Sequence, residues 1–519
     1  MVSFTALSSL TLKRPAPNQK SADAIPILIG DTYHLVHLKA PPHTVHHPER
    51  LQSYWSHLRS KDLIHWSSDG SPPIVSGERP APRDINGAWT GSALIGPDGY
   101  MHIFYTGYNL SQERQVIIHA ASSDIEGSSL VKYPEPISIS SATVTNLALF
   151  EDIDFRDPYV LFNVEEQRYW MLVATRMLDG PWARGCLALL TSTDLSTWHL
   201  EPDPLFALDD IFCPECPELF TLPNGKWYLV YSRFDAPEAG TVYRVSDAPR
   251  GPFQKPKDGS AGCWDGKRWH AAKSYPKAGD PSKRIYFGWI ADRSENKKGV
   301  WGGHMAYPRQ VSAAADGSLR IEPAEEILSE LFRSGPAFKL PPVRLGPYGA
   351  VKKHFLYPTS ANPEPGSSSP TLMSFKFSSS DAASFGILFH ADPDDSGYWL
   401  RFSPTRATPG KPTFTITLSL CSPSDNFWSD QFRLYMPQVV DGLELVRHNN
   451  VFIKQDETIK VLMIGDTLEI FVGGRAISYR FRQDCDEGQG GNTRYGLFVD
   501  DGEVTFRSFS SIVSKPLSE

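Results

Sequence analysis

One pattern of strand, turn and strand occurs five times in the N-terminal part of the chain. Each copy has a short apolar strand, a turn with Gly, Asn or Asp, and a second strand rich in aromatic residues. The second strands fall at residues 31–37, 99–105, 168–173, 225–231 and 283–289. Repeats of this period indicate radially arranged β-sheets whose equivalent positions meet around one central axis. The sequence therefore predicts an all-β protein that begins with a five-bladed β-propeller.

A shorter repeat marks the outer edges of the same blades. Residues 60–66 read Ser-Lys-Asp-Leu-Ile-His-Trp and recur at 192–198 as Ser-Thr-Asp-Leu-Ser-Thr-Trp, with weaker copies that begin at Ser122 and Ser246. Ser and Asp close turns through bonds from their side chains to the backbone, and the following aromatic residue is expected to pack the blade edge. These copies place the fifth blade at about residues 269–321.

The repeats stop where the composition changes. Residues 324–334 carry apolar side chains at helical spacing, and prolines follow closely. From residue 345 onwards the pattern is alternating strands only, which is typical of a β-sandwich. We therefore expect a propeller domain over 1–322, a linker with a short helix over 323–344, and a sandwich over 345–519.

Bulk properties narrow the class of protein. The net charge is -8 without long runs, which argues against a nucleic-acid partner. No apolar run reaches the roughly 20 residues that span a membrane, so no membrane partner is expected. The N-terminus lacks a basic region before its apolar stretch, which favours a cytoplasmic location and leaves secretion open. The motif Cys213-Pro-Glu-Cys216 has no second Cys pair, and we expect neither metal nor cofactor.

Three carboxylates occupy equivalent places in the repeats. Asp23, Asp157 and Glu215 each begin the first strand of a blade. Strands at equivalent positions of a propeller line the central axis, so these residues are predicted to converge on one pocket. Two carboxyl groups facing one sugar are what glycoside hydrolysis requires, with one group charged and one holding a proton.

Several motifs resemble glycoside hydrolase family 32, which comprises invertases, inulinases and levanases. They are Arg156-Asp157-Pro158, Glu215-Cys216-Pro217, residues 89–92 (Trp-Thr-Gly-Ser), residues 55–66 and residues 301–309. The resemblance covers nearly the whole chain in the right order. It implies a five-bladed propeller, an accessory sandwich and retaining hydrolysis of a terminal β-linked furanoside, most simply a β-fructofuranoside.

The resemblance also implies roles for individual residues. Asp23 would be the nucleophile, Glu215 the general acid/base, and Asp157 the transition-state stabiliser. Substrate contacts are expected from Arg156, Trp89, Ser92, Trp55, His57, His270, Lys273 and Trp301. Lys273 has three readings: it binds an anionic group, pairs with a carboxylate, or is a solvated charge. The family's Trp-Met-Asn-Asp-Pro-Asn-Gly is replaced by a stretch around Asp23 that lacks the flanking Asn residues, which leaves the sugar open.

Alternatives therefore remain at this point. Another furanose, such as arabinofuranose or galactofuranose, could be the substrate, or the glycosyl unit could pass to another sugar. A sugar-binding protein that has lost catalysis is a third reading. A carboxylate separation of about 6.5–9.5 Å would predict inversion, as in the related family 43, instead of retention. His43, His46 and His47 could bind metal, line the pocket rim or form a polar loop, and the sandwich could bind sugar or build a homodimer.

Overall fold

The computed structural model describes most of the chain between residues 20 and 514. The described residues are 20–39, 53–68, 73–77, 82–109, 111, 114–127, 129–141, 150–178, 184–208, 210–234, 239–291, 302–333, 335–347, 351–356, 370–379, 381–391, 397–405, 412–421, 444–464, 466–481 and 494–514. The His-rich loop at 43–47 and Trp301 lie outside them.

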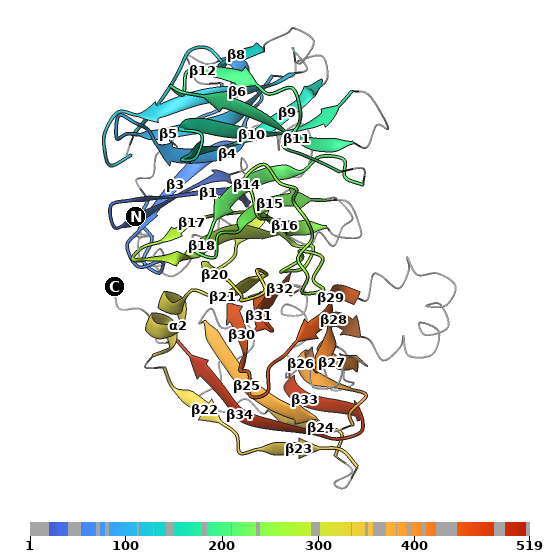
Figure 1. Ribbon diagram of the computed structural model, residues 1–519. Coiled ribbons are helices and arrows are strands. Elements are labelled where there is room, and N and C mark those ends of the chain that lie inside the picture. The colour runs from blue at the N-terminus through green and yellow to red at the C-terminus, as the bar shows by residue number, and fades with distance from the viewer. Residues whose placement is uncertain are drawn as a thin grey trace, which may run out of the picture.

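Five inner strands form a closed ring in the N-terminal domain. They are β1 (Ser21–Ile29), β4 (Gly87–Ile95), β9 (Phe150–Asn163), β14 (Glu215–Thr221) and β17 (Trp269–Lys277). Each contacts the next along the chain, and β17 contacts β1 (Figure 1). The predicted five-bladed propeller is confirmed.

Each inner strand is followed by antiparallel neighbours that complete its blade. The further strands are β2 (Thr32–Lys39) and β3 (Tyr54–Ser60) in blade 1; β5 (Met101–Asn109), β6 (Arg114–Ser122) and β7 (Leu130–Lys132) in blade 2; β10 (Arg168–Met177), β11 (Gly185–Ser192), β12 (Thr197–Leu200) and the short β13 (Phe206–Ala207) in blade 3; β15 (Trp227–Arg233) and β16 (Gly240–Ser246) in blade 4; and β18 (Asp280–Ala291), β20 (Arg309–Ala313) and β21 (Leu319–Pro323) in blade 5. The exception is β8 (Ser138–Ser141), which precedes β9 and pairs in parallel with β12 of blade 3.

A short strand joins the last blade to the first. The strand β19 (Gly303–Met305) pairs with β18 through Trp289↔Met305 and with β1 through Ser21↔Gly303. Blades 5 and 1 therefore share one continuous sheet.

The Ser-x-Asp repeat forms the same turn in blades 1 and 3. One Asp62 carboxylate oxygen accepts the backbone N–H groups of residues 64 and 65, at 2.9 and 2.8 Å. The Asp194 carboxylate likewise accepts two backbone N–H groups, at 2.8 and 2.9 Å. The indoles of Trp66 and Trp198 are buried and donate to the carbonyl three residues earlier. The predicted turn, with its aromatic residue packed against the blade, is confirmed.

The C-terminal domain is a sandwich of two sheets around an apolar core. One sheet has the order β22-β34-β25-β30-β31-β32 with β23 beside β34, and the other has the order β24-β33-β26-β27-β28-β29. The strands are β22 (Ala337–Lys339), β23 (Val343–Leu345), β24 (Lys353–Leu356), β25 (Thr371–Ser379), β26 (Ser384–Ala391), β27 (Gly397–Thr405), β28 (Thr413–Cys421), β29 (Glu444–Phe452), β30 (Ile459–Ile464), β31 (Thr467–Val472), β32 (Arg475–Arg480), β33 (Arg494–Asp501) and β34 (Val504–Val513).

The sandwich begins earlier than predicted. The strands β22 and β23 lie within the expected linker, yet both pair with β34. They were missed because each has only three residues and lies among prolines. The linker is thus reduced to the helix α2 (Glu325–Phe332) and its flanks.

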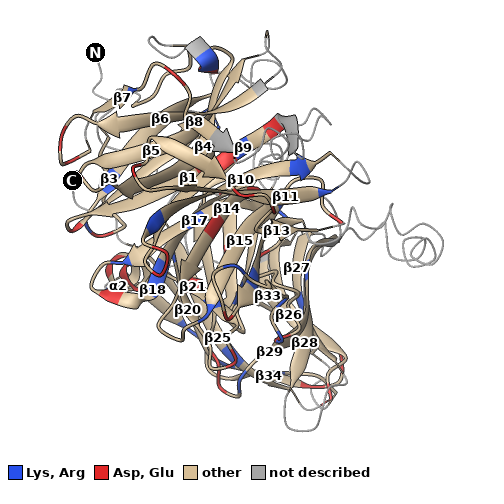
Figure 2. Cartoon of the chain, turned by 45° about the horizontal axis from the view of Figure 1, so that its top comes forward, with Lys and Arg blue, Asp and Glu red and all other residues tan. Residues whose placement is uncertain are grey.

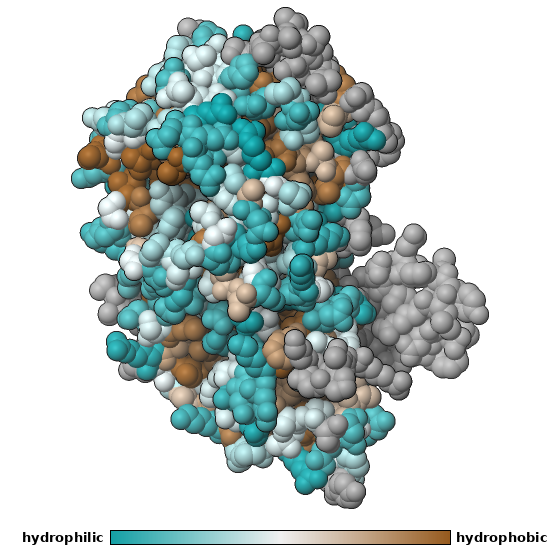
Figure 3. All heavy atoms as spheres, viewed as in Figure 1, coloured by the Kyte–Doolittle hydropathy of each residue, from teal (hydrophilic) through white to brown (hydrophobic). Residues whose placement is uncertain are grey.

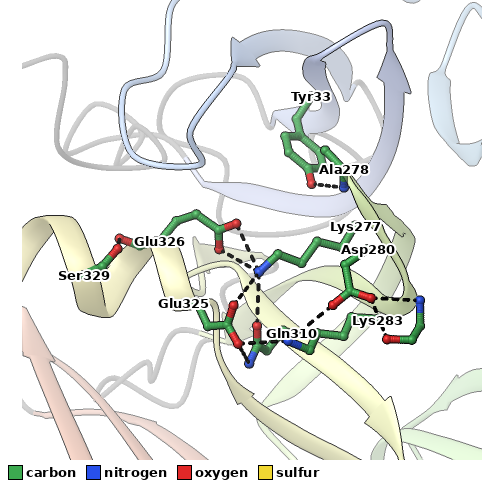
Figure 4. Close-up of polar contacts among 10 residues, drawn as sticks. Tyr33, Lys277, Ala278, Asp280, Lys283, Gln310, Glu325, Glu326 and Ser329 are labelled. Atoms are coloured by element: carbon green, nitrogen blue, oxygen red, sulfur yellow. Dashed lines mark hydrogen bonds and ion pairs between the residues drawn. The ribbon is translucent and has the colours of Figure 1, made fainter.

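Ion pairs fasten this helix to blade 5. The buried Lys277 ammonium lies 3.1 Å from a carboxylate oxygen of Glu325 and 3.1 Å from one of Glu326 (Figure 4). The Tyr33 hydroxyl of blade 1 accepts the Ala278 backbone N–H at 2.7 Å. The helix, blade 5 and blade 1 are therefore tied together at one corner.

A buried ionic network joins the two domains. The Arg309 guanidinium on β20 donates to Asp265 of the propeller and to Glu469 of the sandwich, at 2.5 and 2.7 Å. All three side chains are almost fully buried. The apolar core of the propeller also includes Leu462 and Phe471 of the sandwich. The domains consequently pack as one body.

Charged and apolar residues are both dispersed over the surface. Figure 2 shows Lys, Arg, Asp and Glu scattered over both domains without a basic stripe. On the face seen in Figure 3, apolar areas are small and separated by hydrophilic residues. Among the described residues, no helix combines the length and apolar character that crossing a bilayer requires.

Candidate active site

All five inner strands are interrupted by a register shift. The unpaired residues are Asp23 on β1, Trp89 and Thr90 on β4, Asp157 and Pro158 on β9, Cys216 and Pro217 on β14, and Ala271 and Ala272 on β17. Such β-bulges bend a strand and redirect its side chains, and they are common beside active sites. The same irregularity thus recurs at the equivalent level of every blade.

The bulges hold four residues in the left-handed region of backbone space. Their φ angles are +34° at Asp23, +59° at Asp157, +51° at Cys216 and +50° at Ala271. A non-glycine residue with positive φ is uncommon and marks a backbone that its surroundings must hold. Hydroxyls of the preceding blade supply part of that support, because Thr106 accepts the Asp157 N–H at 2.8 Å and Ser232 accepts the Ala271 N–H at 2.9 Å.

Asp23 is held by an indole from the fifth blade. The Trp289 Nε1–H donates to Asp23 Oδ1 at 2.9 Å. Burial, together with the negative charges of Asp157 and Glu215, raises the pKa of Asp23 to about 7, while the Trp289 bond and the Lys273 charge oppose this rise. The first-blade carboxylate therefore lies within electrostatic range of both other predicted catalytic residues.

Asp157 is fixed by the neighbouring blade. Its Oδ2 accepts the Cys216 backbone N–H at 2.9 Å. Burial and the Glu215 charge raise the pKa of Asp157, against the opposing effect of Arg156. Since Cys216 directly follows Glu215, this bond locks the third and fourth blades together at the level of the two carboxylates.

Glu215 is oriented by Arg156. The guanidinium Nη2 donates to Glu215 Oε1 at 3.0 Å, and the Glu215 side chain keeps 24% of its surface exposed. Asp154 in turn binds Arg156 and accepts from Arg176 Nε at 2.8 Å. The carboxylate that is predicted to donate a proton is thus both anchored and reachable.

The structure brings four further predicted residues to the same level. Arg156 binds Glu215, Trp89 lies within the bulge of β4, and His270 and Lys273 flank the bulge of β17. The Trp89 ring stacks on Tyr108 with centroids 4.6 Å apart. Burial lowers the pKa of His270 to about 4, so its imidazole is neutral at neutral pH.

Three predicted contacts are placed elsewhere by the structure. Trp55 is completely buried and donates to the Ala88 carbonyl at 3.2 Å. His57 is buried against His34, with ring nitrogens 3.0 Å apart. The buried Ser92 hydroxyl accepts the Val160 N–H at 2.9 Å. These three side chains pack the core and join blades, and their contacts with the sugar stay predictions.

Sequence reasoning missed several supporting residues. Trp289 is the last residue of the aromatic-rich second strand of the fifth repeat, residues 283–289. Nothing in that pattern distinguishes it from aromatic residues of the core. Thr106 and Asp154 support the site indirectly, because Thr106 accepts the Asp157 N–H and Asp154 binds Arg156. Glu218 is fully buried and accepts from Ser274 and Arg284, at 2.7 and 3.0 Å, so it supports its blade.

Within the part of the chain that the structure describes, one oxygen of each catalytic candidate accepts a hydrogen bond. These are Oδ1 of Asp23, Oδ2 of Asp157 and Oε1 of Glu215. The second oxygen of each carboxylate is the one that could face a ligand. Three carboxylates arranged in this way can attack a carbon, protonate an oxygen and stabilise a cation between them.

Comparison with known proteins identifies the family. The model of the glycosyl hydrolases family 32 N-terminal domain matches residues 23–323. This chain belongs to glycosyl hydrolases family 32. The match begins at Asp23 and ends with the last strand of the fifth blade, so this family 32 domain is the propeller itself.

Individual relatives agree with the assignment. A fructan 6-exohydrolase of Beta vulgaris is 28% identical over 325 residues, which cover 57% of this chain and 51% of the relative. The chain thus matches about half the length of the curated relatives. The solved fructan 1-exohydrolase IIa of Cichorium intybus has a TM-score of 0.73 at 18% identity and covers 99% of this chain and 98% of its own. The exo-inulinase of Aspergillus awamori has a TM-score of 0.67 at 17% identity, with coverage of 99% and 100%. At these identities the two structures establish the fold, which extends through the sandwich.

Proposed function

We propose that this protein is a retaining glycosidase that removes terminal β-linked furanosyl units, most simply β-fructofuranosyl. The observation that carries the proposal is the placement of Asp23, Asp157 and Glu215 at or beside the bulges of the inner strands of three different blades, where a hydrogen bond holds one oxygen of each. Relatives named as fructan exohydrolase and β-fructofuranosidase support fructose as the sugar.

In the first step Asp23 Oδ2 attacks the anomeric carbon while Oδ1 stays bound to Trp289. The bond from that carbon to the leaving oxygen breaks, and the Glu215 proton passes to the leaving oxygen. A covalent ester between the furanosyl unit and Asp23 results. In the second step Glu215 removes a proton from water, the water oxygen bonds to the anomeric carbon, and the ester bond breaks.

Asp157 stabilises the transition state of each step. Positive charge develops on the furanosyl ring, and a fixed carboxylate beside it lowers the barrier. Cys216 and Thr106 hold Asp157 in place, so little reorganisation is needed when the charge appears.

The test is sugar release from sucrose, inulin, levan and nitrophenyl furanosides by the wild type, Asp23→Ala and Glu215→Gln. Asp31→Ala is the control, because Asp31 is an exposed turn residue paired with Lys61. We expect fructose release that both catalytic variants lose and the control keeps.

Other outcomes separate the alternatives. Release from another furanoside alone would replace fructose by that sugar. Transfer products would show that a sugar competes with water. An α-configured first product would establish inversion and refute the covalent step. Sugar binding without turnover in the wild type would show a protein that binds and does not hydrolyse.

A further inference from the structure

Lys273 crosses the centre of the propeller. It lies on β17 of blade 5, directly after the bulge, and its side chain is 2% exposed. Its ammonium donates to the Gly91 carbonyl on β4 of blade 2. Blades 5 and 2 are not neighbours in the ring, so the side chain spans the central axis beside the carboxylates.

The acceptor of this bond is structurally fixed. A Cβ at position 91 would lie 1.8 Å from the Phe104 carbonyl oxygen, so only glycine fits the approach of β4 to β5. One carbonyl does not compensate the desolvation of a buried ammonium. The remaining compensation comes from charge, because Lys273 acts electrostatically on both Asp23 and Asp157.

The charges around the axis can be counted from the described residues. Asp23, Asp157 and Glu215 are acidic, while Arg156 and Lys273 are basic, and Asp154 is offset by Arg176. His270 is neutral, and burial raises the pKa values of the Cys213 and Cys216 thiols, which stay protonated. One negative charge is left, and a single bound proton neutralises it.

A single proton is what the proposed reaction requires, because the acid must hold one while both aspartates stay charged. Without Lys273 two negative charges would be left, and a second proton would bind at the expense of an aspartate. We propose that Lys273 is a positioning residue that disfavours a second proton on the carboxylate cluster, so that both aspartates ionise at a lower pH than they would without it. This inference rests on the proposed function and adds a determinant of its pH dependence.

The first test is the pH dependence of kcat/KM on the best substrate of the panel. Lys273→Gln keeps a donor without charge, Lys273→Met removes both, and Lys273→Arg keeps the charge. We expect the acidic limb to move upward by about one pH unit or more in the Gln and Met variants and to return toward the wild type in the Arg variant. The exposed Lys267→Met is the matched control.

The second test needs no turnover. The Trp289 indole donates to Asp23, so its emission reports the charge of that carboxylate. The emission of Trp289, obtained by subtracting a Trp289→Phe background, is followed against pH with and without Lys273→Met. The pH at the midpoint of the emission change should be higher in Lys273→Met than in the wild type. Circular dichroism is used to check that the variants are folded.

The outcomes are distinguishable. An unchanged midpoint and an unchanged acidic limb in folded Lys273→Gln and Lys273→Met would overturn the inference. An equal loss of kcat/KM at every pH would also overturn it, because it would indicate a purely structural role. If the wild type shows the emission titration but hydrolyses no furanoside, the proposed function is refuted. A higher pH midpoint of the emission change in Lys273→Met would then still support the role of Lys273.

Discussion

The bond from Trp289 to Asp23 gives the sharpest prediction, in the variant Trp289→Phe. Phe keeps an aromatic ring in the buried space and removes the indole N–H that donates to Asp23 Oδ1 at 2.9 Å. A hydrogen bond to a charged group contributes about 1.5–3 kcal/mol. Because about 1.4 kcal/mol corresponds to one pKa unit, the loss should raise the pKa of Asp23 by about one to two units.

The effect on catalysis depends on the pKa that Asp23 has in the wild type. The pKa of Asp23 is already raised to about 7, so its ionised form falls steeply below neutrality. If Asp23 is the nucleophile, kcat/KM at pH 6 should drop roughly tenfold to a hundredfold, and much of the loss should be recovered at higher pH.

The assay is a pH profile of kcat/KM for wild type and variant on one substrate. Trp66→Phe is the control, because Trp66 also loses an indole bond, to the Leu63 carbonyl at a blade edge. That control should keep the wild-type profile even where it loses stability. A Trp289→Phe enzyme with an unshifted acidic limb would refute the assignment of Asp23 as the group that must be charged.

Three further predictions concern stability. The raised pKa of Asp23 means that the folded state binds the Asp23 proton more tightly than the unfolded state does. The protonated carboxyl therefore contributes to the free energy of unfolding in full below about pH 4, and this contribution is lost as pH rises through about 7. Asp23→Asn should therefore be more stable than the wild type at pH 8 and no more stable at pH 4, as thermal melts at the two pH values will show, and an equal difference at both would contradict this. Arg309→Met leaves Asp265 and Glu469 buried without their cation, which should lower the free energy of unfolding measured in urea by about 3–5 kcal/mol. A change below about 1 kcal/mol would mean that the network does not hold the domains together. Thr106→Val removes the acceptor of the Asp157 N–H, which should lower the free energy of unfolding by about 1–3 kcal/mol. The variant should also lower kcat more than it raises KM. A change in KM alone would argue against a positioning role for Thr106.

The blades and their order were predictable because each depends on local patterns. Alternation and turn residues predict strands, and five copies predict a ring that brings Asp23, Asp157 and Glu215 to equivalent places. The Ser-x-Asp turns were readable for the same reason, since every bond in them spans three residues or fewer.

Other features depend on contacts that no local pattern encodes. Trp289 reaches Asp23 across 266 residues of sequence, and only ring closure brings them together. Trp55 and His57 belong to a matching motif, but a motif does not say which side chains turn into the core. The start of the sandwich was placed too late because β22 and β23 are defined by their partner β34.

The strand β19 places the candidate nucleophile at the seam of the ring. Ser21, two residues before Asp23, pairs with Gly303, and Trp289 pairs with Met305 on the same three-residue strand. The first and last blades are therefore joined next to the hydrogen bond between the Trp289 indole and the Asp23 carboxylate. Residues of β1, β18 and β19 also share one apolar cluster, so opening the seam would expose that core and break the bond from Trp289 to Asp23. The candidate site is therefore complete only when the ring is closed.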